Sequence, residues 1–566
     1  MYSIAKNVQI VIALLKAHGI NQLVLSPGGT NAAFIRGVQD DQFFHCYSVV
    51  DERSALYFAI GIYLSTGKPV GVCCTSAQAT RNFIPGLTEA FYKHVPILAI
   101  TFSKHPQYTY QDYMQAPDQT SLPRDAVKAT YSLPYVSNEH DRMHCERLVN
   151  EAILELTHTI PAPIQLNVPM LDTELTIDVA PELPSVKVIR RYFRKDIPQI
   201  ELNDKKILII VGENRGIDDA IVVKFASITN TTIYVNHLSN MKNDYTIYGN
   251  RLLSCLRQSE FDALLCPDIL ITIGGQTGDY PLYHKIAESK KQFEHWRVSE
   301  KGDVVDTYDH LTKVFECSYN DFFSSFQLTG IDNTYYSVWK NASIEFSTDK
   351  DLPMSAAYIA QQMSRVIPNG SYVNFSILNS LRVWNLFTFK NNVKCFCNVG
   401  AFGIDGCMST FIGQSVMVED LCFMFIGDLS FFYDMNSLGI RHIKKNVRII
   451  LINNNGGVEF KLGGGTLEKR EKIDKFIAAS NHFKSAEGWA VSNGFDYFQI
   501  NNKDSFQEIM EKLIVPSKSP ILIEVIVSDV NDSIAYSLLT QAKDNRTIVD
   551  KLIYQVKRGL YCIFKS

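Results

Sequence analysis

Long apolar runs are missing from this sequence of 566 residues. No segment approaches the ~20 consecutive apolar residues that a membrane-spanning helix needs, so we expect no integral membrane segment. The N-terminal stretch MYSIAKNVQIVIALLKAHGI lacks the small-residue cleavage site of a secretory signal, and its Lys6, Lys16 and His18 fit an amphipathic first helix. The sequence therefore predicts a cytoplasmic protein.

An excess of positive charge and paired metal-binding cysteines are also lacking. The formal net charge is −4, which argues against a general nucleic-acid or anionic-membrane binder. The twelve cysteines include no CxxC pair and no zinc-type spacing. Cys73 and Cys74 lie inside an apolar, strand-like run, so we interpret the cysteines as reduced thiols of the core.

Short apolar runs alternate with helix-length segments through most of the chain. This alternation predicts an α/β protein with parallel sheets, and the length predicts several domains. We expect three doubly wound parallel-sheet domains over residues 1–185, 195–345 and 354–540, and a basic tail over 541–566. The tail is interpreted as a packing helix, with membrane or partner contact as the alternative.

Acidic and amide side chains follow two neighbouring strands of the third predicted domain. CFMFIGD predicts a buried strand that ends at Asp428, and VRIILINN predicts the next parallel strand, which ends near Asn455. Open α/β sheets bind ligands at the carboxyl ends of such strands. Carboxylate, amide and carbonyl oxygens suit Mg²⁺ or Ca²⁺, and glycines with helix N-terminal amides suit a diphosphate. A helix cap at Asp428 and an ordinary turn at NNNGG are the simpler alternatives.

The two halves together resemble the signature of the thiamine diphosphate-dependent enzymes, which opens with Gly-Asp and closes with Asn-Asn. Here the interval from Asp428 to Asn455 is 27 positions, with a strand, a helix and a strand between them. The resemblance implies that Asp428, Asn455 and the carbonyl of Gly457 hold a Mg²⁺ (or Ca²⁺ or Mn²⁺) ion that anchors the cofactor diphosphate.

A second group of motifs lies near the N-terminus. An SPGG turn is followed by a DER junction that contains Glu52, and then by a loop that contains Thr75 and Ser76. This order resembles the pyrimidine-binding domain of the thiamine enzymes. In these enzymes a carboxyl group must contact the aminopyrimidine ring, so that the ring can remove the thiazolium C2 proton. Glu52 is the candidate; an acidic residue that merely favours a first helical turn is the alternative.

In detail, the chain is most similar to the menaquinone-pathway synthases that join succinyl semialdehyde to isochorismate. SPGGT, DER, NVGAFGIDG, GDLS and NNNGG follow the order of that family's motifs over nearly the whole length. The resemblance implies pyrimidine-binding, central and diphosphate-binding domains, and a homodimer or homotetramer with the site between subunits. It also implies that Ile404 is the apolar wedge that bends the cofactor, with core packing as the alternative. The implied cofactor-binding residues are Gly28, Thr75, Ser76, Gln115, Ser380, Gly403, Ile404, Gly427, Asp428, Leu429, Ser430, Asn455 and Gly457.

The expected substrate-binding positions depart from that family. Its pocket arginines are replaced by Thr30, Trp384 and Val399, a lysine by Asp279, and an apolar residue after NNNGG by Glu459. Loss of three charge-assisted contacts would weaken dicarboxylate binding by on the order of 5 kcal/mol, and Asp279 and Glu459 would repel such a ligand. The candidate substrate residues are Thr30, Lys104, His105, Trp384, Val399, Glu459 and Phe460.

We therefore expect a thiamine diphosphate- and Mg²⁺-dependent decarboxylase or carboligase. It would act on a 2-oxo acid and either add the acyl unit to an aldehyde or ketone, such as a keto-sugar, or release an aldehyde. One alternative is the menaquinone-pathway synthase itself, which acts on 2-oxoglutarate and isochorismate, with Arg81, Arg382 or Arg441 supplying the charge. A non-catalytic homologue is another, against which the intact Glu52, Asp428 and Asn455 argue. A nicotinamide or flavin oxidoreductase is disfavoured because no G-x-G-x-x-G fingerprint occurs, and FAD is not expected.

Overall fold

The computed structural model describes residues 1–171, 179–326, 333–344, 346, 349–462 and 476–541. The chain divides into two compact units, one of residues 1–196 with 300–316 and one of residues 197–299 with 317–566. Apart from Gln541, the predicted tail lies outside the described residues. Within the described ranges, no helix combines the length and the apolar character needed to cross a bilayer.

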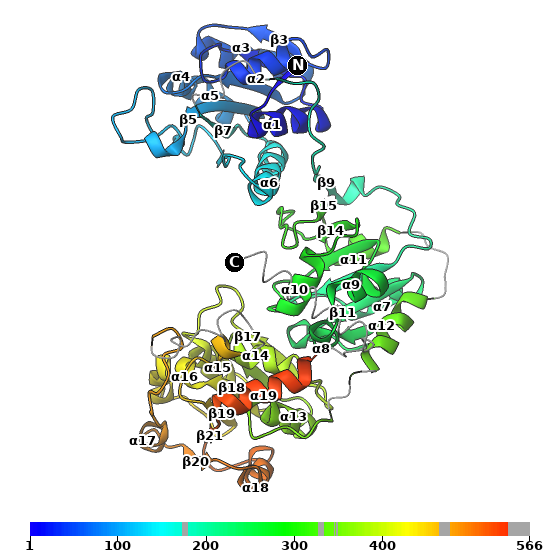
Figure 1. Cartoon of the computed structure of the whole chain (residues 1–566), viewed down its shortest axis with the longest axis vertical. Coiled ribbons are helices and arrows are strands. Elements are labelled where there is room, and N and C mark those ends of the chain that lie inside the picture. The colour runs from blue at the N-terminus through cyan, green and yellow to red at the C-terminus, as the bar shows by residue number, and fades with distance from the viewer. Residues whose placement is uncertain (172–178, 327–332, 345, 347–348, 463–475, 542–566) are drawn as a thin grey trace, which may run out of the picture. The chain divides into compact units, whose positions relative to one another are not determined.

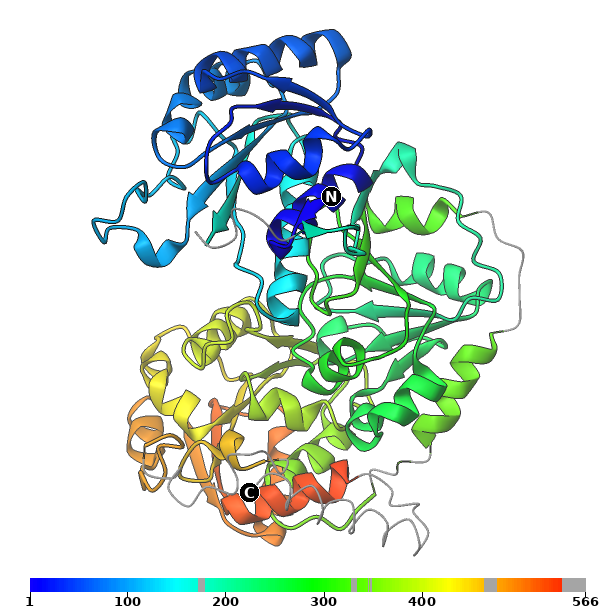
Figure 2. The same cartoon turned by 45° about the horizontal axis from the view of Figure 1, so that its top comes forward.

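A six-stranded parallel sheet with helices on both faces forms most of the first unit (Figures 1 and 2). Its strands are β2 (Gln22–Leu25), β3 (His45–Ser48), β4 (Val70–Cys74), β5 (Ile97–Lys104), β6 (Ala129–Ser132) and β7 (Ile164–Met170). Their order is β3-β2-β4-β5-β7-β6. The helices are α1 (Lys6–Ala17), α2 (Ala32–Gln39), α3 (Glu52–Thr66), α4 (Gln78–Asn82), α5 (Ile84–Tyr92) and α6 (Glu139–Glu155).

Both faces of this sheet are buried, because alternate side chains of each strand point to opposite sides. Leu23 and Phe102 pack with residues of α1 and α6. Val24 and Ala99 pack with residues of α3 and α5 on the other side. Burial on two faces explains the near-continuous apolar strand sequences. The unit also contains two short strand pairs, β1 (Tyr2–Ser3) with β8 (Val179–Ala180) and β9 (Arg190–Phe193) with β15 (Leu311–Glu316).

The second unit contains two parallel sheets. The first of them, which we call the central sheet, is formed by residues 207–298. The strands there are β10 (Ile207–Val211), β11 (Thr231–Val235), β12 (Thr246–Tyr248), β13 (Ile269–Ile273) and β14 (Glu294–Val298), in the order β12-β11-β10-β13-β14. The main helices around it are α7 (Asp219–Ser227), α8 (Asn250–Cys255), α10 (Tyr280–Ala287), α11 (Tyr319–Ser324) and α12 (Thr334–Ile344). The loops after β10 and β13 touch, since a Cβ at Gly212 would lie 1.9 Å from the carbonyl oxygen of Gly275.

The other sheet of this unit has six parallel strands in the order β17-β16-β18-β19-β21-β20. The strands are β16 (Tyr372–Phe375), β17 (Lys394–Cys397), β18 (Cys422–Gly427), β19 (Val447–Asn453), β20 (Asp496–Ile500) and β21 (Ile521–Ile526). The helices are α13 (Ala356–Val366), α14 (Asn379–Trp384), α15 (Cys407–Ser415), α16 (Asp428–Tyr433), α17 (Glu487–Ser492), α18 (Lys503–Leu513) and α19 (Asp529–Thr540). Together, the sheets confirm the predicted α/β fold with helix-flanked parallel sheets.

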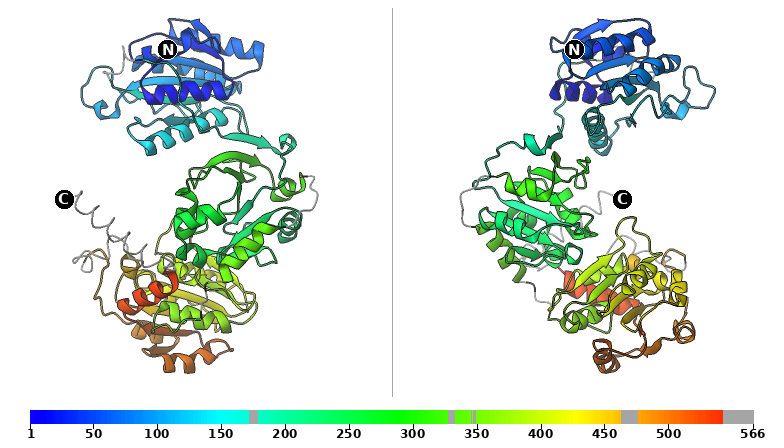
Figure 3. Two further views of the ribbon diagram at one scale, coloured as in Figure 1. Left: turned by 45° about the vertical axis from the view of Figure 1, so that its right-hand side comes forward. Right: turned by 180° about the vertical axis from the view of Figure 1, so that it is seen from behind.

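Helices cover both faces of this six-stranded sheet (Figure 3). On one face, α13, α14, α18 and α19 pack over alternate strand residues such as Phe425 and Ile450. On the other, α15 to α17 pack over Met424 and Ile449. The register pairs Gly427, the last residue of β18, with Ile452 of β19. The residues that follow these two strands therefore lie at one edge of the sheet.

Candidate functional site

Asp428 links the end of β18 to the turn after β19. Its side chain is buried, with 2% of its surface exposed. Oδ1 accepts a hydrogen bond from the amide of Leu429 at 2.7 Å. Oδ2 accepts hydrogen bonds from the amides of Asn454 at 3.2 Å and Gly456 at 3.0 Å. Burial raises the pKa of this carboxyl, and the hydrogen bonds that it accepts partly offset that rise.

His482 also contacts Asp428, and the sequence analysis missed it. Its Nε2 lies 3.1 Å from Asp428 Oδ2. Its Nδ1 accepts a hydrogen bond from the amide of Lys484 at 3.0 Å, so the ring proton lies on Nε2 and is donated to the carboxylate. His482 lies 54 positions from Asp428, in a segment without helix or strand, and no local pattern marks it.

A cavity of about 310 Å³ opens at this edge of the sheet. The predicted residues that line it are Ser380, Trp384, Ile404, Gly427, Asp428, Leu429, Ser430, Gly457, Glu459 and Phe460. The predicted residues Val399, Gly403 and Asn455 belong to the same unit but are not part of its lining. Asn454 and Gly456, neighbours of the predicted metal-binding residues, do line it.

The three asparagines of the NNNGG turn have different partners. Asn453 Nδ2 donates to Glu524 Oε1 at 2.6 Å, and Asn454 Nδ2 donates to Asp532 Oδ2 at 3.0 Å. Burial raises the pKa of Asp532 to about 6, so at neutral pH this group is a carboxylate that accepts the bond. That contact orients Asn454 with Oδ1 away from Asp532. Asn455 adopts a left-handed φ of +60°.

The oxygen atoms beside the cavity suit a hard metal ion. Asn454 Oδ1 is buried and accepts no hydrogen bond from any residue that the structure describes. Within those same residues, no three His, Cys, Asp or Glu side chains are placed to hold a metal. An ion beside Asp428 would therefore take amide and carbonyl oxygens, together with oxygens of a bound ligand, which is the ligand type that Mg²⁺ prefers. The residues present fit a Mg²⁺–diphosphate group.

The glycine turn brings backbone close to this position. A Cβ at Gly456 would lie 2.8 Å from Ser480 Cα, so a larger residue would force the two segments apart. Ser430 Oγ donates to the Ile404 carbonyl at 2.6 Å, which holds the GIDG loop against α16. Leu378, in the turn before Ser380, adopts φ +66°, and such strain in a non-glycine residue is common at ligand sites.

Trp384 and Val399, two positions where the resembling family has arginine, are both buried. Trp384 lines the cavity, and its ring centroid lies 4.2 Å from that of Phe425. Its carbonyl oxygen lies 2.9 Å from His237 Nε2. Val399 is 2% exposed and lies in the core. Neither position offers a charge to a substrate.

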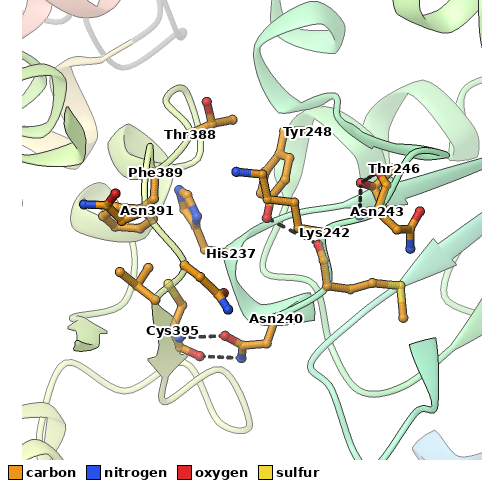
Figure 4. Close-up of a pocket in the computed structure, with 13 residues that line it drawn as sticks. His237, Asn240, Lys242, Asn243, Thr246, Tyr248, Thr388, Phe389, Asn391 and Cys395 are labelled. Carbon is orange, nitrogen blue, oxygen red and sulfur yellow. Dashed lines mark hydrogen bonds between the residues drawn. The ribbon is translucent and has the colours of Figure 1, made fainter. Parts of the chain in front are cut away.

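A second cavity, of about 270 Å³, lies between the segments 237–248 and 388–395 (Figure 4). Asn240 spans these segments, because its side chain bonds to the Cys395 carbonyl at 2.8 Å and to the Cys395 amide at 2.7 Å. Thr246 Oγ1 donates to the Asn243 carbonyl at 2.7 Å. The side chains of Asn240 and Thr246 thus form hydrogen bonds within the protein. We therefore interpret this cavity as a gap where the two sheets of the unit pack together, and not as a ligand site.

The charged residues that were expected to repel an acid have different surroundings. Asp279 is 4% exposed and accepts hydrogen bonds from Tyr234 Oη at 2.6 Å, Asn250 Nδ2 at 2.9 Å and the Leu282 amide at 3.0 Å. It caps α10 and does not line the cavity, so the expectation that it meets substrate has no support in the structure. Glu459 does line the cavity.

Arg382, Arg81 and Arg441 are the alternative sources of positive charge that the sequence offers. Arg382 Nη2 lies 2.5 Å from Glu459 Oε1, so its charge is paired. Arg81 Nη2 donates to the Asp118 carbonyl at 2.7 Å. Arg441 is exposed.

In the first unit, Glu52 is the first residue of α3. The preceding Asp51 caps the helix by accepting a hydrogen bond from the Ser54 amide. Glu52 is therefore not needed as the cap, and its Oε2 accepts a hydrogen bond from Asn82 Nδ2 at 3.0 Å.

The SPGG turn and the Thr-Ser loop of the first unit are in direct contact. Thr30 Oγ1 lies 2.7 Å from Thr75 Oγ1 and accepts a hydrogen bond from the Ser76 amide at 3.0 Å. A Cβ at Gly28 would lie 2.4 Å from Thr75 Cβ. Ser76 Oγ is buried and has no partner among the described residues. Thr30, a predicted substrate residue, is buried and holds the two loops together.

Gln115 is exposed, whereas the nearby Gln119 is buried. Gln119 Oε1 accepts a hydrogen bond from the Ala77 amide at 3.0 Å, directly after the Thr-Ser loop. Lys104 ends β5 with its Nζ 6.0 Å from the ring centre of Tyr113, and His105 Nδ1 accepts a hydrogen bond from the Gln107 amide at 3.4 Å.

Comparison with known proteins agrees with this geometry. Residues 6–122 match the family described as thiamine pyrophosphate enzyme, N-terminal TPP binding domain. The chain is 34% identical to the 2-succinyl-5-enolpyruvyl-6-hydroxy-3-cyclohexene-1-carboxylate synthase of Phocaeicola vulgatus, over 94% of this chain and 97% of the relative. The synthase of the same name from Bacteroides thetaiotaomicron is 32% identical over 94% and 98%, and that of Flavobacterium johnsoniae 28% identical over 91% and 95%. The chain belongs to the thiamine pyrophosphate-dependent, carbon–carbon bond-forming enzymes, in the family of these synthases.

Proposed function

We propose that this enzyme uses thiamine diphosphate and Mg²⁺ to decarboxylate a 2-oxo acid and to add the remaining acyl unit to a carbonyl acceptor. The observation that carries the proposal is the unpaired Asn454 Oδ1 beside the buried Asp428 at the cavity. A buried amide oxygen without a donor is costly, and a metal ion would remove that cost.

In this reaction we assign a separate role to each of the following residues. Asp428 and Asn454 would supply oxygens to the metal, and the backbone of Gly456, which packs closely against Ser480, would line the cavity beside it. Ile404 would offer an apolar contact to the cofactor, and the Glu52 carboxyl would contact its aminopyrimidine ring and hold the proton exchanged there. When bound, thiamine diphosphate would supply a nucleophilic carbon for the 2-oxo group and an electron sink for decarboxylation.

The second candidate is the reaction implied by the resemblance to the menaquinone-pathway synthases, in which a succinyl unit from 2-oxoglutarate is transferred to isochorismate. The identity of 34% over 94% of the chain favours it. The uncharged Thr30 and Trp384, and the pairing of Arg382 with Glu459, argue for different substrates. A dicarboxylic donor would need an arginine that is free to bind it.

A panel of 2-oxo acids separates the two candidates. We would measure CO₂ release from pyruvate, 2-oxoglutarate and phosphonopyruvate, with and without thiamine diphosphate and Mg²⁺, and each with isochorismate or a simple aldehyde as acceptor. Cofactor-dependent release from pyruvate or another small acid, lost in Glu52→Gln, supports the first candidate. Release from 2-oxoglutarate that requires isochorismate supports the second and rejects altered substrates.

Calorimetric titration with thiamine diphosphate and Mg²⁺ accompanies the panel. Glu52→Gln should still bind the cofactor, because Asp428 and Asn454 are unchanged, and this separates lost chemistry from lost folding. A protein that binds no thiamine diphosphate in the presence of Mg²⁺ would contradict both candidates.

A further inference from the structure

Glu459 and Arg382 form an ion pair at the cavity of the second unit. Glu459 lies in the short helix η7 (Val458–Lys461), directly after the glycine turn, and lines the cavity. Its Oε1 lies 2.5 Å from Arg382 Nη2. The Arg382 guanidinium also lies over the ring of Tyr280, 5.3 Å from its centre. Arg382 is thus held by two partners, and its charge is neutralised by a residue of the cavity wall.

The second carboxylate oxygen of Glu459 has different surroundings. Glu459 Oε2 is buried and accepts no hydrogen bond within the part of the chain that the structure describes. A buried charged acceptor without a donor is unfavourable, so a ligand that brings a donor to this wall gains more affinity than one without it. Trp384 and Phe460, which also line the cavity, present aromatic surface.

We propose that the Arg382–Glu459 pair selects the acceptor, and that the acceptor is an uncharged carbonyl compound with a hydroxyl group that donates to Glu459 Oε2. This inference rests on the proposed carboligation. A carboxylate on the acceptor would meet the like charge of Glu459, and Arg382 is already paired. A hydroxy aldehyde or a ketose satisfies both conditions, because its hydroxyl donates and carries no charge.

Three variants test the proposal beside the wild-type enzyme. Glu459→Leu removes the carboxylate, and Glu459→Gln retains its shape. Asp529→Asn is the matched control, since Asp529 also forms an ion pair, with Lys461 at 2.6 Å, but does not line the cavity. The first assay compares kcat/KM for glycolaldehyde and acetaldehyde, which differ by one hydroxyl group. The second is a calorimetric titration with succinate, an inert dicarboxylate that reports whether Arg382 is free.

The wild-type enzyme and Asp529→Asn should prefer glycolaldehyde by about tenfold or more, since the hydroxyl bonds to a charged acceptor. In Glu459→Leu this preference should shrink to about twofold, through KM rather than kcat. Succinate should bind this variant about tenfold more tightly, because Arg382 has lost its partner. For Glu459→Gln, both the preference for glycolaldehyde and the affinity for succinate should lie between those of the wild-type enzyme and of Glu459→Leu.

Equal aldehyde preference in the wild-type enzyme and Glu459→Leu, with unchanged succinate affinity, would overturn the proposal. If Glu459→Leu does not fold, the same comparison is made between the wild-type enzyme and Glu459→Gln. Absence of CO₂ release in every protein, with a rise in succinate affinity in Glu459→Leu, would reject the proposed reaction but support the exclusion of anions by Glu459. The succinate titration therefore distinguishes failure of the pair from failure of the reaction.

Discussion

His237 Nε2 lies 2.9 Å from the carbonyl oxygen of Trp384, whose ring forms part of the cavity wall. The carbonyl can only accept, so Nε2 carries the proton and donates. His237 follows β11 of the central sheet, and Trp384 ends α14 of the neighbouring sheet. The contact therefore joins the two sheets of the second unit and fixes the end of the helix that carries Ser380 and Arg382.

The stability of the enzyme should depend on the ionisation of His237. Burial lowers the pKa of His237 to about 4, whereas an unfolded histidine has a pKa near 6.5. Between these values the unfolded chain binds more protons, so the contribution of the neutral His237 to stability is fully present above about pH 6.5 and is lost as the pH falls toward 4. Between pH 7.5 and 5.5, the titration of His237 should lower the free energy of unfolding by about 1.3 kcal/mol.

Melting midpoints at pH 7.5, 6.5 and 5.5 test this dependence. His237→Gln retains a side-chain donor but cannot titrate, so its midpoint should fall less with pH than that of the wild-type protein. His140→Gln, at an exposed position of α6, is the control and should follow the wild-type protein. Parallel curves for wild type and His237→Gln would show that His237 does not contribute.

Asn454, rather than Asn455, should be the asparagine that controls metal affinity. Asn454→Ala removes the unpaired amide oxygen and should weaken Mg²⁺-dependent cofactor binding by on the order of 100-fold. Asn455→Gly should change it by less than about threefold, because glycine readily adopts the φ of +60° found there. Calorimetric titration of both variants measures the difference. A larger loss in Asn455→Gly would restore the ligand assignment expected from the motif.

The sequence was sufficient to predict the edge of the sheet at which the cavity lies, but not which asparagine of the turn lines that cavity. Gly-Asp after an apolar run predicted Asp428 at a strand end, because such runs form buried parallel strands. Three consecutive asparagines are chemically identical, so nothing local shows which amide faces the cavity. That choice depends on the contact of Asn454 with Asp532, 78 positions away, and on the backbone of Asn455.

Other parts of the site could not be predicted for the same reason. His482 contacts Asp428 through a segment without regular structure. The environment of Asp279 is set by Tyr234 and Asn250, which lie 45 and 29 positions away. Sequence distance hides these contacts, whereas periodicity within a strand or helix is visible locally.

Asp279 should matter for stability and not for substrate choice. Asp279→Ala would leave three donors without their acceptor and should cost about 2–3 kcal/mol, measured as a lower melting midpoint. The ratio of kcat/KM for pyruvate and 2-oxoglutarate should stay within about twofold of the wild-type ratio. Glu459→Leu is the contrasting variant, for which that ratio should move toward 2-oxoglutarate. If the ratio of kcat/KM for pyruvate and 2-oxoglutarate changes in Asp279→Ala, Asp279 takes part in substrate binding after all.

The outer face of α3 should be an interface between copies of this chain. Ala55, Leu56, Ala59 and Ile60 face the core, yet Tyr57, Phe58 and Leu64 on the other side are 45%, 46% and 64% exposed. A helix that is apolar on all sides is normally buried on all sides, so we expect a homodimer or homotetramer.

Sedimentation of the wild-type protein and of the double variant Phe58→Asp with Leu64→Asp tests this interface. Two charges in an apolar contact should dissociate the oligomer, because each would be buried without a partner. Met417→Asp, at an exposed apolar residue after α15, is the control and should leave the assembly intact. Glu52 is the first residue of α3 and therefore lies on the helix of the expected interface. If the active site requires two subunits, the double variant should also lose cofactor-dependent CO₂ release. A monomeric wild-type protein, or an assembly unchanged in the double variant, would assign the exposed face of α3 to another role.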